Sequence, residues 1–218
     1  MEAGENIRIV LLAQGNNMAV YIAGTEVIEG DMRLGHMWHE VEAILDVLDY
    51  YQITHFIEIG VHEGGLTWIL LNHFESLNYL GIDINLGIAR AKVKNKVKSI
   101  RSAELIERDC FARETIEEVQ EWMPDGKPCL IYCDNGNKPK EILFYAPIMR
   151  IGDILMAHDY HDGRRIVRGL EWYGFKTGGL QPEVCPEDVV FMYKMCEELE
   201  KVDLSDTRII GFMRYNIE

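Results

Sequence analysis

The chain has 218 residues, 48% of them hydrophobic, and a formal net charge of -14 at pH 7. This length allows one domain with a sizeable core, and the acidic charge disfavours nucleic acid as a partner because Lys and Arg bind a phosphate backbone. No apolar run is long enough to span a bilayer, and the first residues, MEAGENIRIV, lack a basic region, so we expect a cytoplasmic protein without a membrane partner.

The N-terminal part, residues 1–52, is expected to form a hairpin and a helix within the same globule as the rest of the chain. Two apolar, β-rich stretches within residues 7–23 flank Gln14, Gly15, Asn16 and Asn17, which tolerate the backbone conformations of a tight turn. Apolar residues then recur at helical spacing over residues 37–48, which predicts a helix with one buried face.

From residue 54 onward the sequence predicts alternating strands and helices. Strands are expected at residues 55–59, 78–82, 104–107, 128–133 and 153–157, and helices at residues 66–73, 87–97, 115–122 and 139–149. Alternation of this kind is typical of right-handed crossovers in a doubly wound, mostly parallel α/β sheet. In such sheets ligands bind beyond the carboxyl ends of the strands.

The C-terminal part departs from this alternation. We expect helices at residues 164–173 and 186–200, with a glycine-broken loop at residues 176–181 between them. Residues 208–215 are expected to form a last strand that closes one edge of the sheet, in antiparallel orientation.

The cysteines form no C-x-x-C pair, and two of them lie at the ends of an apolar run, so we expect reduced core thiols. They are Cys110, Cys129, Cys133, Cys185 and Cys196.

Residues 56–65, FIEIGVHEGG, are an apolar run that ends in an acid and then breaks into glycines. A buried parallel strand followed by glycines is typical of a nucleotide pocket, because glycine lets the backbone turn tightly and approach a ligand. A dinucleotide site has G-x-G-x-x-G, but His62 stands where the second glycine would be. Glu58 would repel a pyrophosphate and attract a cation, so the pattern favours a cationic or zwitterionic ligand.

An acid lies in or directly after each predicted strand of the alternating region. Any one of them could cap a helix or begin a turn. Taken together, they are expected to converge on one rim of the sheet, where a ligand would bind. They are Glu58, Asp83, Asp109, Asp134 and Asp159.

These motifs resemble those of the class I S-adenosylmethionine (SAM) dependent methyltransferases. FIEIGVHEGG is similar to their first motif as found in cephalosporin hydroxylase-like and macrocin O-methyltransferase-like members, and Gly81 to Asp83 (GID) resembles the second. Residues 131–160 resemble the same group. The resemblance covers residues 53–218 and implies a Rossmann-like fold of the seven-stranded type, with SAM as cofactor and a small-molecule acceptor methylated at oxygen.

The resemblance also implies which residues bind SAM. Glu58 would orient the loop or the amino-acid moiety, Asp83 would bind the ribose hydroxyls and Asp109 would bind the adenine amino group. The complete set of expected cofactor-binding residues is Glu58, Gly60, Val61, His62, Gly64, Gly65, Asp83, Ile84, Asp109, Cys110, Phe111 and Asp134.

Relatives such as catechol O-methyltransferase hold a divalent cation with an acid after the fourth strand and an acidic pair after the fifth. The matching positions are Asp134, His158 and Asp159, which implies a Mg or Mn site. His158 replaces an acid of those relatives, and imidazole suits Mn, Fe or Zn better than Mg. Asn135 and Asn137 are either neutral ligands or residues that shape the turn.

The alternative is that Asp134 caps the next helix and His158 is an ordinary hydrogen-bonded residue. In a site without metal, a side chain must act as base. The candidates are His158 and His161, because histidine titrates near neutrality, and Lys138 if burial favours its neutral form.

Other classes of protein stay open at this point. The rivals are a nicotinamide-dependent oxidoreductase and a non-catalytic SAM-binding module, and a homo-oligomer is compatible with the sequence. His36, His55 and His73 have no spacing that predicts a ligand set.

Overall fold

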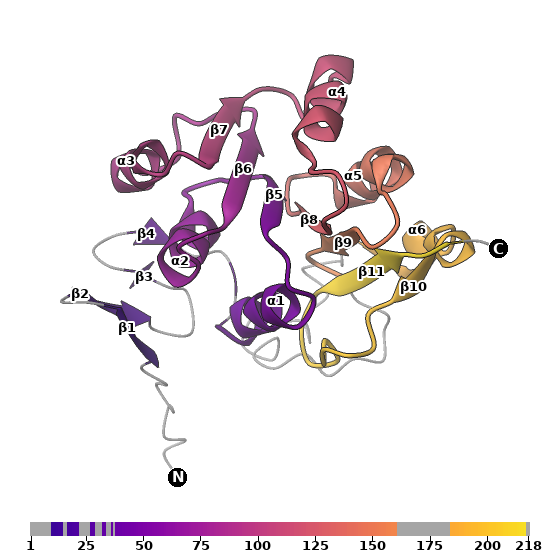
Figure 1. The fold of residues 1–218 in the computed structure, drawn as a ribbon, viewed down its shortest axis with the longest axis horizontal. Coiled ribbons are helices and arrows are strands. Elements are labelled where there is room, and N and C mark those ends of the chain that lie inside the picture. The colour runs from indigo at the N-terminus through magenta and orange to yellow at the C-terminus, as the bar shows by residue number, and fades with distance from the viewer. Residues whose placement is uncertain are drawn as a thin grey trace, which may run out of the picture.

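A seven-stranded sheet forms the centre of the protein. The structure is a computed structural model that describes residues 10–14, 17–21, 27–28, 32–33, 36, 38–160 and 184–216. The strand order is β10-β11-β9-β8-β5-β6-β7 (Figure 1). The strands are β5 (His55–Ile59), β6 (Asn78–Asp83), β7 (Ala103–Glu107), β8 (Cys129–Cys133), β9 (Ile154–Ala157), β10 (Cys196–Glu198) and β11 (Ile210–Arg214). The pairs among β5 to β9 are parallel, which confirms the predicted doubly wound sheet.

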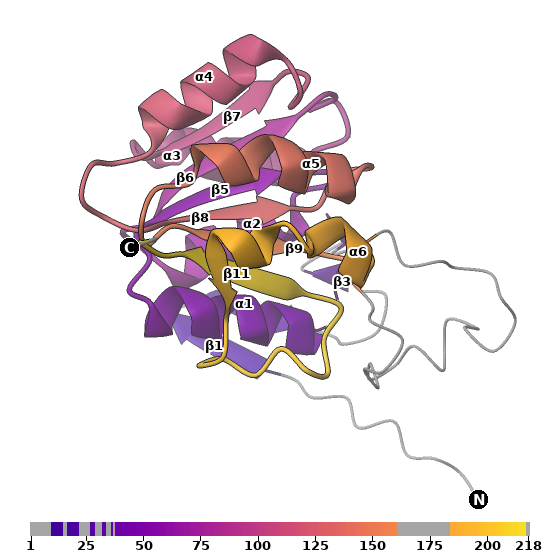
Figure 2. The ribbon, with the colours of Figure 1, turned by 90° about the vertical axis from the view of Figure 1, so that its right-hand side faces the viewer.

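Helices cover both faces of this sheet. They are α1 (Trp38–Tyr50), α2 (Gly65–His73), α3 (Ala91–Ser99), α4 (Arg113–Trp122), α5 (Lys138–Tyr145) and α6 (Pro186–Val189). Side chains alternate along each strand, so Phe56 packs in one core cluster with α1, α2 and α3, whereas Ile57 packs in the other with α4, α5 and α6. Figure 2 shows α4, α5 and α6 lying in front of the strands.

The N-terminal hairpin is confirmed. Strands β1 (Val10–Gln14) and β2 (Asn17–Tyr21) pair in antiparallel orientation, and Gln14 lies opposite Asn17. A second pair, β3 (Val27–Ile28) and β4 (Met32–Arg33), follows and is also antiparallel. Helix α1 confirms the predicted helix, and its apolar face is part of the core. None of the helices in the described residues is long and apolar enough to cross a membrane.

Two observed helices, α3 and α5, differ by four residues at one end from the predicted helices 87–97 and 139–149. Helix α3 begins at Ala91 because Arg90 has an extended backbone, and the N–H of Arg90 donates to the carbonyl of Glu63 at 3.1 Å. Helix α5 ends at Tyr145 and continues as a 3-10 turn over Ala146–Ile148, because Pro147 has no N–H to donate to the preceding helical turn.

The predicted helix over residues 186–200 is wrong. Only α6 is helical at the start of this segment; a 3-10 turn over Met192–Lys194 and strand β10 follow. Met195 leaves the helical conformation, and Cys196 pairs with Arg214 of β11. Pairing of backbone groups with the sheet outweighs the helical spacing of the apolar residues, of which Val189, Met192, Cys196 and Leu199 are buried although the predicted helix does not form.

Strand β11 is antiparallel as predicted, but it does not form the sheet edge. It lies between β9 and β10, and β10 forms the edge. The predicted helix at residues 164–173 and the loop at residues 176–181 lie outside the described residues. All five cysteines are free, and four of them are buried, which confirms the prediction of core thiols.

Candidate functional site

A cleft of about 590 Å³ opens at the carboxyl ends of β5, β6, β8 and β9. Gly60, Asp83, Asp134 and His158, each of which follows or ends one of these strands, all line it. Its position agrees with the rule that ligands bind beyond the carboxyl ends of parallel strands. The cleft therefore joins the glycine-rich motif to the acids expected on the rim.

Two glycines of the loop after β5, Gly60 and Gly64, let this loop pack closely against neighbouring parts of the fold. Gly60 has φ 98° and Gly64 has φ 85°, values that favour glycine. A Cβ atom at Gly60 would lie 2.7 Å from the carbonyl oxygen of Asp134, and one at Gly64 would lie 2.6 Å from Val93 Cγ1. Both glycines thus let the loop approach neighbouring segments, the turn after β8 and helix α3.

Asp83, at the end of β6, holds this loop in place. Its Oδ2 accepts hydrogen bonds from the N–H groups of Val61 at 3.0 Å and His62 at 2.9 Å, and Oδ1 accepts from Asn85 N–H at 2.8 Å. The N–H of Gly60 donates to the carbonyl of Ile82. These loop amides are therefore engaged within the protein, and the first turn of α2 supplies the next backbone donors along the cleft.

Glu58 lines the base of the cleft, but its carboxyl group points into the protein. Thr67 Oγ1 and Tyr79 Oη both donate to Glu58 Oε2, at 3.0 Å and 2.5 Å. Burial raises the pKa of Glu58 to about 8, outweighing the hydrogen bonds from Tyr79 and Thr67, which lower it. Glu58 is therefore protonated at neutral pH and ties β5 to β6 and α2, which is the role of a loop organiser.

The raised pKa of Glu58 predicts a specific dependence of stability on pH. The folded pKa of about 8 exceeds the ordinary value of 4.5, so the stabilisation from the protonated carboxyl is full below pH 4.5 and is lost as the pH rises to about 8. Glu58→Gln cannot ionise and is expected to melt several degrees above the wild type at pH 9. Melting curves from pH 5 to pH 9 measure this. If the melting temperatures of the two proteins changed equally with pH, the raised pKa of Glu58 would be contradicted.

A cluster of charged side chains occupies the other end of the cleft, where β8 and β9 end. Asp134 follows β8, Asp159 follows β9, and Arg208 precedes β11. Helix α1 contributes Glu40, and His36 precedes that helix. The whole ionic cluster consists of His36, Glu40, Asp134, Lys138, His158, Asp159 and Arg208.

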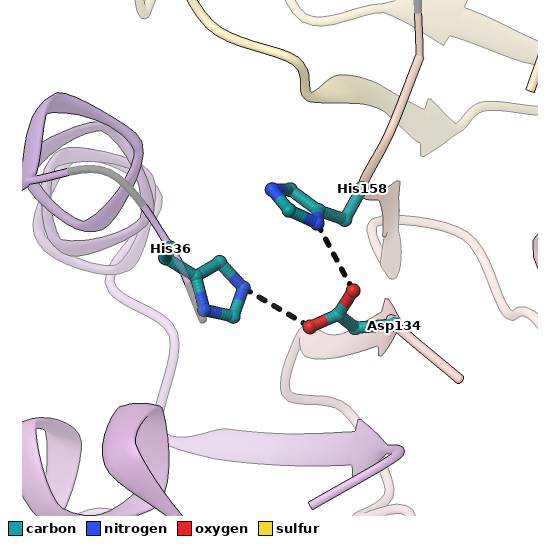
Figure 3. A group of neighbouring side chains, drawn as sticks. All are labelled: His36, Asp134 and His158. Atoms are coloured by element: carbon teal, nitrogen blue, oxygen red, sulfur yellow. Dashed lines mark ion pairs between the residues drawn. The ribbon is translucent and has the colours of Figure 1, made fainter. Parts of the chain in front are cut away.

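Asp134 lies between two histidines (Figure 3). Its Oδ1 is 3.1 Å from His158 Nδ1, and its Oδ2 is 3.1 Å from His36 Nε2. Burial alone would raise the pKa of Asp134, but His158 and His36 outweigh it and hold that pKa far below its usual range. Tyr132 Oη is 2.9 Å from His36 Nε2. Asp134 is thus a carboxylate at any pH at which the protein would work.

His158 contacts a second carboxylate through its other ring nitrogen. Its Nε2 is 3.1 Å from Oε2 of Glu40, which is fully buried, and Glu40 Oε1 accepts from Arg208 Nε at 2.9 Å. Burial would lower the pKa of His158, but Asp134 and Glu40 outweigh it and raise it to about 10. At neutral pH this imidazole is therefore a proton donor and not a base.

Asp159 is bound by two cations. Its Oδ1 is 2.6 Å from Arg208 Nη1 and its Oδ2 is 3.1 Å from Lys138 Nζ. Lys138 also donates to the carbonyl of Asn135 at 2.8 Å and lies 3.6 Å from Asp134 Oδ1. Burial would raise the pKa of Asp159, but the neighbouring cations lower it. The cations of the cluster therefore neutralise its carboxylates.

The turn after β8 shows which residue caps α5 and what Asn135 and Asn137 do. Asn137, and not Asp134, caps α5, because its side chain accepts from Lys140 N–H at 3.3 Å. The alternative in which Asp134 is the helix cap is therefore wrong. The side chain of Asn135 donates to Cys110 Sγ at 3.5 Å, so Asn135 and Asn137 both shape the turn.

The residues expected on the adenine side, Asp109 with its neighbours Cys110 and Phe111, are not among the described residues that line the cleft. Ile84, another of the expected cofactor-binding residues, does line it. Asp109 Oδ1 accepts from Phe111 N–H at 2.9 Å, and the Phe111 ring contacts Phe144. His161 lies outside the described residues.

Sequence reasoning missed three members of the ionic cluster, namely His36, Glu40 and Arg208. Their partners are far away in the chain, so no spacing could indicate them. Glu40 did leave a signal, because it lies one helical turn before the buried Ile44, on the side of α1 that faces the core. A buried acid on such a face requires a partner, and Arg208 and His158 are those partners.

Comparisons with known proteins show the fold. No protein-family model matches the sequence, and neither does any curated protein. The structure of CmcI aligns over 88% of this chain and 78% of CmcI, with a TM-score of 0.60 and 14% identity. The O-methyltransferase TomG from Streptomyces achromogenes, solved in complex with SAM, aligns over 84% of this chain and 82% of TomG, with a TM-score of 0.53 and 12% identity.

A third solved structure is that of SibL, a SAM-dependent methyltransferase. It aligns over 82% of this chain with a TM-score of 0.55 and 12% identity, and this chain spans only 55% of SibL. At such identities the likeness concerns the path of the backbone. The chain therefore has the Rossmann-like α/β fold that is also found in CmcI, TomG and SibL.

Proposed function

We propose that the protein transfers a methyl group from SAM to an oxygen atom of a small-molecule acceptor. The observation that carries this proposal is that one cleft contains both the glycine-rich loop held by Asp83 and an ionic cluster around Asp134. The volume of about 590 Å³ is within the range of small-molecule sites, roughly 300–1,000 Å³. The shared fold with TomG, solved in complex with SAM, supports the same cofactor.

The residues of the cleft fit the parts of SAM. Gly65 and Leu66, in the first turn of α2, would bind its carboxylate with backbone N–H groups. Asp83, beside the loop of Gly60, Val61, His62 and Gly64, would bind the ribose hydroxyls. Two isoleucines that line the cleft next to Asp83, Ile84 and Ile88, are 66% and 46% exposed, and we assign to them the adenine ring.

SAM supplies a methyl group on a positively charged sulfur. In the transfer, the acceptor hydroxyl releases its proton to water, its oxygen forms a bond to the methyl carbon, and the carbon–sulfur bond breaks with its electrons going to sulfur. Without a bound ion, His158 and Lys138 line the cleft as cations and would stabilise the deprotonated acceptor oxygen. With an ion on His158, which binds it only after loss of the Nδ1 proton, the ion and Lys138 would do so. We therefore expect an acidic hydroxyl, such as that of a phenol, as the methyl acceptor.

A divalent cation is part of the proposal. Asp134 and His158 offer a carboxylate and an imidazole to the cleft, 3.1 Å apart, and these groups fit such an ion. A bound cation lowers the pKa of a coordinated hydroxyl. Asp134 would then orient the acceptor through the ion, and Asp159 would hold Lys138 near Asp134.

Binding of SAM is the direct test of this function. A ligand at about 100 times its dissociation constant adds roughly 2.7 kcal/mol of stability, so SAM and S-adenosylhomocysteine are each expected to raise the melting temperature by several degrees. NADH is the control ligand. Stabilisation by NADH with none by SAM or S-adenosylhomocysteine would favour the nicotinamide-dependent oxidoreductase instead.

A further inference from the structure

Three candidate metal ligands from distant parts of the chain point toward one another (Figure 3), and all three residues line the cleft. One ligand atom each from His36, Asp134 and His158 lies within 4.8 Å of the other two. The two imidazole rings have centroids 4.6 Å apart, and each has a nitrogen 3.1 Å from one oxygen of Asp134. Metal–ligand bonds of about 2.0–2.2 Å place neighbouring ligand atoms roughly 3 Å apart, so the three side chains need only small movements to bind one ion.

Glu40 provides independent support, because it orients His158 in the way that metal-binding histidines are usually oriented. In metal sites the ring nitrogen that does not bind the ion typically donates to a carboxylate or carbonyl. His158 Nε2 lies 3.1 Å from Glu40 Oε2, and Arg208 donates to both oxygens of Glu40, at 2.9 Å to Oε1 and 3.3 Å to Oε2. Arg208 Nη2 also lies 3.2 Å from His158 Nε2. The contact with Glu40 directs His158 Nδ1 toward Asp134 and the cleft.

The donor atoms indicate the class of ion. Two imidazole nitrogens and one carboxylate suit first-row transition ions, whereas Mg²⁺ takes oxygen ligands almost exclusively. Asp159, which the family resemblance implies as a ligand, has Arg208 on one oxygen and Lys138 on the other. His36 is better placed than Asp159 to be the third ligand.

We propose that His36, Asp134 and His158 form a three-ligand site for a first-row transition ion such as Mn²⁺, Fe²⁺, Co²⁺ or Zn²⁺, and that Mg²⁺ is not its ion. This inference deepens the proposed function, since it names the ion and its third ligand in the acceptor end of the same cleft. Binding of the ion itself requires no methyl transfer. The proposal also gives His36, which precedes α1, a direct part in the site.

Lys138 is a cation close to the proposed ligands, and an added ion would repel it. Its Nζ is 3.6 Å from Asp134 Oδ1, but it is closer to Asp159 at 3.1 Å and to the carbonyl of Asn135 at 2.8 Å. Lys138 can therefore keep its two closer partners while Asp134 turns toward an ion.

The test is a titration of the full chain, freed of metal by a chelator, with Co²⁺ and separately with Mg²⁺. Calorimetry and the visible absorption of bound Co²⁺ report the binding. We expect one Co²⁺ per chain, no binding of Mg²⁺ at the same concentrations, and at least tenfold weaker Co²⁺ binding by His36→Ala. The matched control is His73→Ala, at the end of α2, which is expected to bind Co²⁺ like the wild type.

Three outcomes would overturn the proposal: no binding of Co²⁺, equal binding of Co²⁺ by the wild type and His36→Ala, or displacement of Co²⁺ by equimolar Mg²⁺. Melting curves with SAM on the same samples separate this proposal from the proposed function. Stabilisation by SAM without Co²⁺ binding leaves methyl transfer standing and removes the site. Co²⁺ binding without stabilisation by SAM supports the metal site and contradicts methyl transfer from SAM.

Discussion

Arg208→Ala is expected to lower the free energy of unfolding by about 3–5 kcal/mol, because it removes one partner of a buried ion pair. Arg208 lies 2.9 Å from Oε1 of Glu40, whose side chain is fully buried, and 2.6 Å from Asp159 Oδ1. Without the guanidinium, the charge of Glu40 stays in the core with less compensation. Unfolding in urea, with the slope checked for two-state behaviour, measures the loss.

An exposed arginine offers a matched control for this experiment. Arg113 pairs with Glu117 one helical turn away on α4, at 2.6 Å, but its side chain is 86% exposed. Exposed pairs of this kind contribute little, so Arg113→Ala is expected to leave the unfolding midpoint almost unchanged. If both variants unfolded like the wild type, the ionic cluster would not stabilise the fold.

Asp134→Asn is expected to reduce methyl transfer by at least about 100-fold, within the range of roughly 10²–10⁴ that a positioned acid–base or orienting group contributes. The substitution keeps the size of the side chain but removes the charge that lies between His36 and His158. The measurement is the formation of S-adenosylhomocysteine from SAM with a panel of phenolic acceptors, including catechols.

Two controls make this result specific to the chemistry. Asp134→Asn should still be stabilised by SAM, because the loop after β5 and Asp83 are unchanged. Asp125→Asn, at a fully exposed position, should have wild-type activity. Unchanged product formation by Asp134→Asn would instead favour the non-catalytic SAM-binding module.

Most of the sheet could be predicted because its signals are local. The apolar runs of β5, β6 and β8 alternate with helical patterns, and each predicted strand from β5 to β9 lies within one residue of the observed strand at both ends. Prediction failed for residues 186–200, where the helical spacing is real but the backbone pairs with β11. A pattern of side chains does not reveal a backbone partner that becomes available only in the folded sheet.

The expectation that five acids converge on one rim of the sheet is confirmed only in part. Asp83, Asp134 and Asp159 do line the cleft. Glu58 also lines the cleft, but its carboxyl accepts hydrogen bonds from Thr67 and Tyr79, because it shares the face of β5 with Phe56 and that face packs on α2. Asp109 caps its own turn. Position at a strand end predicts nearness to the cleft, but the neighbouring donors decide the direction of each carboxylate.

The sequence by itself determined the alternating fold, the glycine-rich loop after β5 and the edge of the sheet at which the cleft lies, since each depends on periodicity or on residues close together in the chain. Only the tertiary structure decided that His36, just before α1, and Glu40, in its first turn, meet Asp134, His158 and Arg208. These contacts join segments about 100 residues or more apart. They depend on how α1 packs against the sheet, and no local pattern encodes that packing.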